Sequence, residues 1–164
     1  KITIVPRTMG ALGYVMNVPE EEKYLNTKKE LEARLVELMA GRAAEEIVFE
    51  TVTTGAANDI QQATNLARAM VTQYGMSDKV GMIQYGGDDN EVFIGRDLAH
   101  TKSYGNGVAD TIDTEVKRII DECYQKARDI IKQYDYVLHS CASLLIEKEK
   151  INQEEFEALF SPAQ

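Results

Sequence analysis

One long stripe of apolar residues constrains the fold of this chain more than any other feature. Between residues 112 and 134 the apolar side chains recur every three or four positions, which predicts an amphipathic helix of roughly 25 residues. The stripe consists of Ile112, Val116, Ile119, Cys123, Ala127, Ile130 and Tyr134. A second stripe follows directly, with Val137, Cys141, Leu144 and Leu145. The spacing of Asn152 and Glu155 is typical of a helix cap, so residues from about 108 to 161 are predicted to form a helical hairpin.

The start of the chain predicts a small sheet followed by a helix. Lys1 to Val5 alternates apolar and polar residues, and Leu12 to Val18 has the character of a second strand, which together predict a small sheet or hairpin. Thr27 and Glu30 have the spacing of a capping box, in which each side chain satisfies a free amide of the first turn. The helix that they begin is predicted to run to about Phe49.

A second helix in this half carries an apolar stripe from Ile60 to Tyr74, and Gly75 is well placed to end it. Thr54 and Asn58 are both suitable caps for its start. Further along, Val92 to Ile94 predicts a short strand. Four methionines are interpreted as core residues: Met39, Met70, Met76 and Met82. The predicted fold class is therefore mainly α, with a small N-terminal sheet and a C-terminal helical hairpin.

Composition and charge indicate one globular domain and exclude several kinds of protein. A chain of 164 residues can bury a core without help from metals or disulfides. The net charge of −9 argues against a nucleic-acid surface, because phosphate binding relies on clustered Lys and Arg. No window approaches the length of about 18 apolar residues that marks a membrane span, so the chain itself is expected to be soluble. Cys123 and Cys141 lack a C-x-x-C spacing and are expected to be buried free thiols.

Two runs separated by a short gap carry a family resemblance. They are GRAAEEIVFE (41–50) and TTGAANDIQQATNLARAMVTQYGMS (53–77). With KITIVPR, ALGYVMNVPEEE, EVFIGRD and IDTEVKRIIDECYQKA, they make the chain similar to the peptidase domain of the FtsH family. The resemblance implies a helical metallopeptidase domain over residues 1–164, with the sheet and the site-side helices in about residues 1–80.

Members of the FtsH family are ATP-dependent zinc proteases that form hexameric rings. The resemblance therefore implies a parent protein that degrades unfolded or membrane proteins as a homo-hexamer. It also implies anchoring in the bacterial cytoplasmic membrane through segments outside this chain, with this domain on the cytoplasmic side. ATP is expected to bind a separate domain, because this sequence has no G-x-x-x-x-G-K-[ST] run.

The resemblance assigns one metal ligand to this chain, because Asp59 matches the family's third zinc ligand. The other two ligands are the histidines of an HExxH helix, whose Glu is the general base. His100 and His139 lie in no such motif, and the helix is expected upstream of Lys1. The chain is thus expected to be an N-terminally truncated peptidase domain with no catalytic residue of its own, no bound zinc and no activity alone. Without the resemblance, Asp59 is most simply a carboxylate at the positive end of a helix dipole. The alternative for the parent is a catalytically inactive assembly or scaffold module.

Two further groups of residues are candidates for supporting roles. Glu45 and Glu46 are consecutive helix positions about 100° apart, so at most one faces the site, where it would accept a hydrogen bond from a ligating His. The alternative is a surface Glu that pairs with Arg42. A possible substrate-binding strand comprises Leu12, Gly13, Tyr14, Val15 and Met16. An edge strand there would pair with an extended peptide through its backbone, whereas the alternative is an ordinary half-buried strand.

Overall fold

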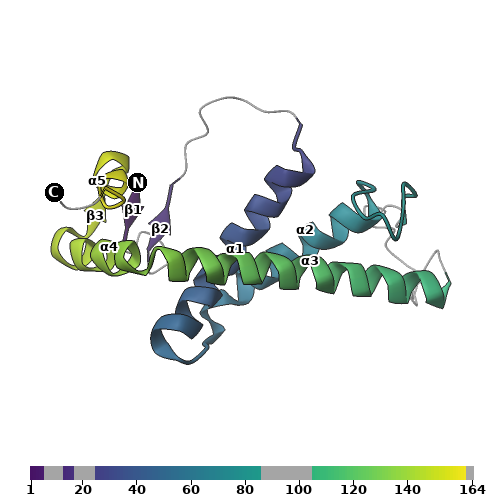
Figure 1. Cartoon of the computed structure of the whole chain (residues 1–164), viewed down its shortest axis with the longest axis horizontal. Helices are drawn as coiled ribbons and strands as arrows, with labels where there is room; N and C mark the ends of the chain where they lie inside the picture. Colours follow the sequence, from purple (N-terminus) through teal and green to yellow (C-terminus); the bar gives the residue numbers. More distant parts are fainter. Residues whose placement is uncertain (6–12, 17–24, 86–104, 162–164) are drawn as a thin grey trace, which may run out of the picture. The chain divides into compact units, whose positions relative to one another are not determined.

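The computed structural model describes residues 1–5, 13–16, 25–85 and 105–161, which divide into two compact units (Figure 1). One unit comprises Asn26–Asp129, and the other comprises Lys1–Leu25 with Ile130–Gln164. Helices account for most of the described residues, and the strands are short. The prediction of a mainly α chain with a small sheet is confirmed. The predicted strand at 92–94 lies outside the described residues.

The unit Asn26–Asp129 begins with α1 (Lys28–Phe49), whose two ends lie where the sequence predicts them. The Thr27 side chain accepts a hydrogen bond from the Glu30 amide at 3.3 Å, and the Thr27 amide donates to Glu30 Oε2 at 2.8 Å. This reciprocal pair is the predicted capping box. At the other end Glu50 adopts a left-handed conformation with φ of 52°, which ends the helix after Phe49.

A single turn of 3-10 helix, η1 (Thr54–Ala56), leads into α2 (Ala57–Thr72). The chain leaves α2 through Gly75, which has a φ of 61°, and the Met76 amide donates to the Met70 carbonyl at 2.9 Å. A glycine with positive φ and this backward hydrogen bond is a common way to end a helix, and it confirms the predicted role of Gly75.

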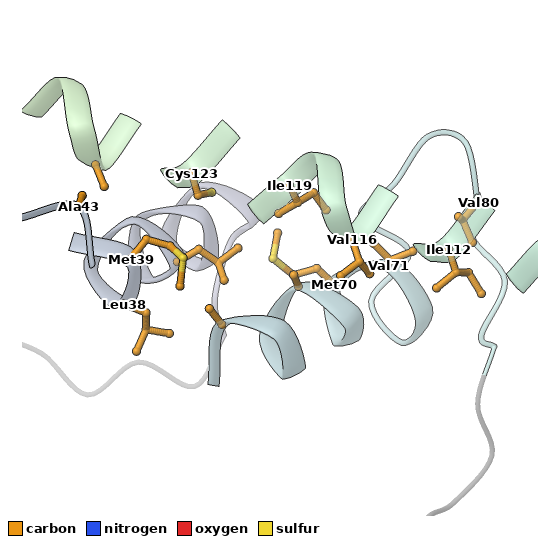
Figure 2. Packing of buried hydrophobic residues seen from close by; sticks show 14 residues of the cluster. Leu38, Met39, Ala43, Met70, Val71, Val80, Ile112, Val116, Ile119 and Cys123 are labelled. Atoms are coloured by element: carbon orange, nitrogen blue, oxygen red, sulfur yellow. The ribbon is translucent and has the colours of Figure 1, made fainter. Parts of the chain in front are cut away.

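The core of this unit lies between α1, α2 and α3 (Asn106–Gln133), as Figure 2 shows. Each helix contributes one apolar stripe, and the buried members include Leu35, Leu38 and Met39 from α1, Ala63, Ala67, Met70 and Val71 from α2, and Ile112, Val116, Ile119 and Cys123 from α3. Met39 and Met70 are core residues, as predicted, and Met76 packs against the cluster. The prediction for Met82 is wrong, because its side chain is 95% exposed. It lies against Gly75 in the turn after α2, where a Cβ on Gly75 would be 3.4 Å from Met82 Cγ.

A buried carboxylate fastens the segment after α2 to α3. Glu115 is 1% exposed and accepts a 2.6 Å hydrogen bond from Ser77 Oγ. Arg118 donates to the two Glu115 oxygens through Nε at 3.0 Å and Nη2 at 3.1 Å, and Lys79 Nζ lies 3.6 Å away. Chiefly because of the Arg118 hydrogen bonds, the pKa of Glu115 falls to about 2. The group is therefore a charged anchor at neutral pH.

The second unit contains a three-stranded antiparallel sheet of order β2-β1-β3. Its strands are β1 (Ile2–Thr3), β2 (Tyr14–Val15) and β3 (Lys150–Ile151). In β1, Ile2 is opposite Val15 on one side and Ile151 on the other. The pairing of β1 with β2 confirms the predicted N-terminal hairpin, although β2 is shorter than the predicted strand. β3 was not predicted.

Helices α4 (Asp135–Lys148) and α5 (Gln153–Ala158) flank β3 and complete this unit as a C-terminal pair of helices. The predicted hairpin over about 108–161 also included α3, most of which belongs to the other unit. Asn152 and Glu155 form the predicted cap, with the Glu155 amide donating to Asn152 Oδ1 at 2.8 Å. Cys141, Leu145 and Ile151 form its small core. No disulfide links the described cysteines, and burial raises the pKa of both the Cys123 and the Cys141 thiols. Within the described ranges, no helix has the length and apolarity needed to cross a bilayer.

Candidate functional site

Asp59 lies in the first turn of α2, where its side chain is half-buried. The N-cap of α2 is Ala56, which makes no side-chain capping bond, so neither Thr54 nor Asn58 is the cap that the sequence suggested. In the part of the chain that the structure describes, no hydrogen bond or ion pair reaches the Asp59 carboxylate. A carboxylate in this position can stabilise the positive end of the α2 dipole, and it can equally serve as an oxygen ligand for a metal ion.

The loop that leads to Asp59 is fastened to α1 at Thr53. Thr53 Oγ1 donates to Glu45 Oε1 at 2.6 Å, and the Thr53 amide donates to Glu45 Oε2 at 3.3 Å. Arg42 Nη2 donates to the Thr53 carbonyl at 2.8 Å, and its Nη1 lies 3.5 Å from Glu45 Oε2. The hydrogen bonds from Thr53 lower the pKa of Glu45, with a smaller contribution from Arg42. Two side chains of α1 therefore hold both backbone groups of one loop residue.

Gly55 completes this attachment, because the loop is tight against the α1 side chains. A Cβ at this position would lie 3.2 Å from Thr53 Oγ1 and 3.5 Å from Glu45 Oε1. The Gly55 amide also donates to Thr53 Oγ1 at 3.1 Å. These contacts account for the first Thr and the Gly of the TTGA sequence. The Thr53 hydroxyl donates to Glu45 and accepts from Gly55, and a small residue is favoured at position 55.

Glu46, the next residue, contacts different partners and joins α1 to α3. The Tyr124 hydroxyl donates to Glu46 Oε2, and Arg128 Nη1 donates to Glu46 Oε1 at 2.6 Å. Burial, together with the hydrogen bond to Glu46, raises the pKa of Tyr124. Both glutamates therefore make polar contacts within the unit. Glu45 binds the loop and also pairs with Arg42, which is the pairing that the alternative interpretation predicts. The sequence did not identify Tyr124 and Arg128 as partners of Glu46. Their spacing of four residues indicates only that they share one face of a helix.

Whether zinc fits this site can be judged from the ligands present. A carboxylate oxygen is a normal zinc ligand, and a site needs at least three protein ligands. Residues 1–5, 13–16, 25–85 and 105–161 contain no group of three His, Cys, Asp or Glu able to hold a metal. His100 lies outside these ranges, and His139 belongs to the other unit, where its Nδ1 lies 2.9 Å from the Asp135 carbonyl oxygen. The described residues therefore form no complete zinc site, and Asp59 has the donor chemistry of one zinc ligand.

The predicted substrate strand contains β2, which lies at an edge of the sheet that the described residues form. Lys1 and Met16 exchange backbone hydrogen bonds, with Met16 N donating at 2.9 Å and Lys1 N donating at 3.2 Å. Because such pairs alternate along an antiparallel ladder, the amide and carbonyl of Val15 face away from β1. Gly13 lets β2 approach β1 closely, since a Cβ there would lie 2.6 Å from the Thr3 carbonyl oxygen. Leu12 lies outside the described residues.

Comparison with known proteins identifies the family. The sequence profile of peptidase family M41 matches residues 1–159. The chain is 48% identical over 161 residues to "ATP-dependent zinc metalloprotease FtsH 1" of Thermoanaerobacter sp., covering 98% of this chain and 26% of that protein. It is 45% identical over 161 residues to "ATP-dependent zinc metalloprotease FtsH" of Thermotoga maritima, with the same coverage. The protein of that name from Caldicellulosiruptor bescii is 48% identical over 165 residues, covering all of this chain and 27% of the relative. The chain thus spans about a quarter of the length of these relatives, and it belongs to peptidase family M41.

Proposed function

We propose that this chain is the part of a zinc-dependent endopeptidase domain that supplies the Asp59 ligand. The observation that carries the proposal is a half-buried carboxylate without a partner among the described residues, at the end of a loop that Glu45 and Arg42 fasten to α1. A helix-dipole carboxylate needs no such fastening, whereas a metal ligand must be held in one position. The names of the relatives, all zinc metalloproteases, support the same interpretation.

In this proposal each residue of the chain has a limited task. Asp59 supplies one oxygen ligand, while an HExxH helix outside residues 1–164 supplies two histidines and the general base. Glu45 sets the position of the ligand loop through Thr53. When bound, zinc would polarise the scissile carbonyl and make a water molecule more acidic. The isolated chain is accordingly inactive.

The wider assembly is also a proposal, supported by the names of the relatives, which describe them as ATP-dependent. The parent protein would form a homo-hexameric ring in the bacterial cytoplasmic membrane, with this domain on the cytoplasmic side. A separate ATP-binding domain would feed unfolded or membrane proteins to the protease.

Removal of the metal tests the protease function directly. The full-length protein is expected to contain close to one zinc per chain by elemental analysis and to cleave an unfolded protein. A chelator should stop cleavage, and added zinc should restore it, because the metal supplies several kcal/mol of transition-state stabilisation. The chelator must be selective for zinc and Mg²⁺ kept in excess, because ATP hydrolysis needs Mg²⁺. ATP hydrolysis measured in parallel then serves as the control and should continue. A full-length protein that hydrolyses ATP but neither binds zinc nor cleaves would instead be an inactive scaffold module.

We further propose that β2 binds an extended substrate through its outer edge. Val15 is 62% exposed, and its outward backbone amide and carbonyl are the groups that would pair with a peptide. Val15→Pro removes that donor but leaves the bonds between Lys1 and Met16 intact. It is expected to raise the KM for an unfolded protein by up to about tenfold, the value of one hydrogen bond, without changing zinc content. Val15→Thr keeps the amide and should behave like the wild type, and equal effects of the two variants would refute backbone pairing.

A further inference from the structure

The last two turns of α1 have little apolar packing to hold them. Ala43 is the last buried residue of this helix, while Val48 is exposed and Phe49 is 70% exposed. The last turn also lacks a basic residue that would favour the negative end of the helix dipole. Among the described residues, the side-chain polar contacts of this helix end run through Glu45 and Glu46.

The contact through Glu46 is formed by two residues on one face of α3. Tyr124 and Arg128 are four residues apart, and the Arg128 guanidinium carbon lies 6.0 Å from the centre of the Tyr124 ring. The ring supports the guanidinium while both side chains donate to the same carboxylate. Arg128 Nε is buried without a hydrogen-bond partner in the described part of the chain.

The two glutamates link the loop to α3 through the end of α1. They are consecutive positions of one helix, so a contact that holds Glu46 against α3 also restrains the backbone that carries Glu45. Glu45 in turn holds Thr53, which begins the loop before Asp59. We propose that Tyr124 and Arg128 are positioning residues for Asp59, acting through Glu46 and the end of α1. This inference rests on the proposed role of Asp59 as a zinc ligand.

Hydrogen exchange and zinc affinity in the full-length protein test this inference. Arg128→Met and Tyr124→Phe are expected to accelerate amide exchange in peptides covering residues 44–57, while peptides covering residues 63–71 in the core stay unchanged. Zinc affinity, measured by competition with a chelator, should fall about tenfold, the lower end of the range for groups that support a metal ligand. Arg128→Lys keeps a cation within reach of Glu46 and should restore most of both properties.

Lys117→Met on the same helix is the matched control, because among the described residues it removes a cation whose ion pair is with the exposed Asp121. It should alter neither readout. The inference is overturned if Arg128→Met leaves exchange at 44–57 and zinc affinity unchanged, or if it accelerates exchange equally in all core peptides. Asp59→Ala tests the proposed function separately from the role of Tyr124 and Arg128. A protein that keeps its zinc after Asp59→Ala refutes the role of Asp59 as a ligand.

Discussion

Replacement of Asp59 by Ala is expected to abolish zinc binding in the full-length protein and to slow the cleavage of an unfolded protein at least about a thousandfold. The reason is that the metal contributes several kcal/mol to the transition state, and a loss of about 4 kcal/mol corresponds to three powers of ten. Asp59 has no partner among the described residues, so its removal breaks no internal hydrogen bond. Elemental analysis and the rate of cleavage are the two measurements.

The helix-dipole interpretation of Asp59 predicts a different result. A carboxylate that only favours the start of α2 contributes about 0.3–1 kcal/mol to stability, so Asp59→Ala would lower the free energy of unfolding slightly and leave the zinc in place. Asn58→Ala, one position earlier in the same first turn, is the control and should retain zinc and activity. Asp59→Asn keeps the shape and one oxygen but loses the charge, so an intermediate zinc affinity is expected. Zinc retained by Asp59→Ala would contradict the ligand role.

Replacement of Glu115 by Ala is expected to cost about 3 kcal/mol of folding free energy, the lower end of the range for a broken buried ion pair because Arg118 is partly exposed. The change leaves the buried Ser77 hydroxyl without its acceptor and releases Arg118 and Lys79. Urea denaturation of the 164-residue chain measures the effect. Glu122→Ala is a matched control, because Glu122 accepts from the same arginine at 2.9 Å but is exposed, and it should cost about 0.5 kcal/mol or less.

The same carboxylate gives the chain a defined sensitivity to acid. The folded pKa of Glu115 is about 2, below its ordinary value of 4.5. A depressed carboxyl pKa contributes stability that is fully present above the unfolded value and is lost as the pH falls towards the folded value. The wild-type chain should therefore lose this contribution between about pH 5 and pH 2. Glu115→Gln, which keeps an acceptor for Ser77 but has no charge, should lack this component, and identical pH curves for the two proteins would contradict the assignment.

The helices and their ends follow from local chemistry and were therefore predictable. The Thr27–Glu30 and Asn152–Glu155 boxes, the stop at Gly75 and the apolar stripe of α3 depend on residues within a few positions of each other. β3 depends instead on a partner at the other end of the chain. A strand of two residues between helices shows no alternation, so no pattern in the sequence marks it.

The contacts around the candidate ligand could not be predicted from the sequence, and the ligand role of Asp59 itself stays a prediction. The residues alone make Asp59 a helix-end carboxylate, and only the family resemblance raises the ligand role. The two glutamates were expected to point in different directions, which they do, but one was expected to face solvent. Sequence spacing shows that Tyr124 and Arg128 share a face of α3, yet the partner of that face is set by tertiary packing. Met82 was predicted to be buried but is exposed, because apolar character without a helical periodicity does not determine burial.

The pairing of Ile2 with Ile151 has a consequence for synthesis of the protein. A ribosome adds roughly 5–20 residues per second, so β1 emerges about 8–30 s before its partner β3 has been made. During that interval the β3-facing edge of β1 has no native strand to pair with, and such edges are prone to pair with other chains. α1 and α2 can pack together long before then. The β1–β3 pairing accordingly forms only after the segment from Ile2 to Ile151 has been made, which makes it a late step in the synthesis of this region.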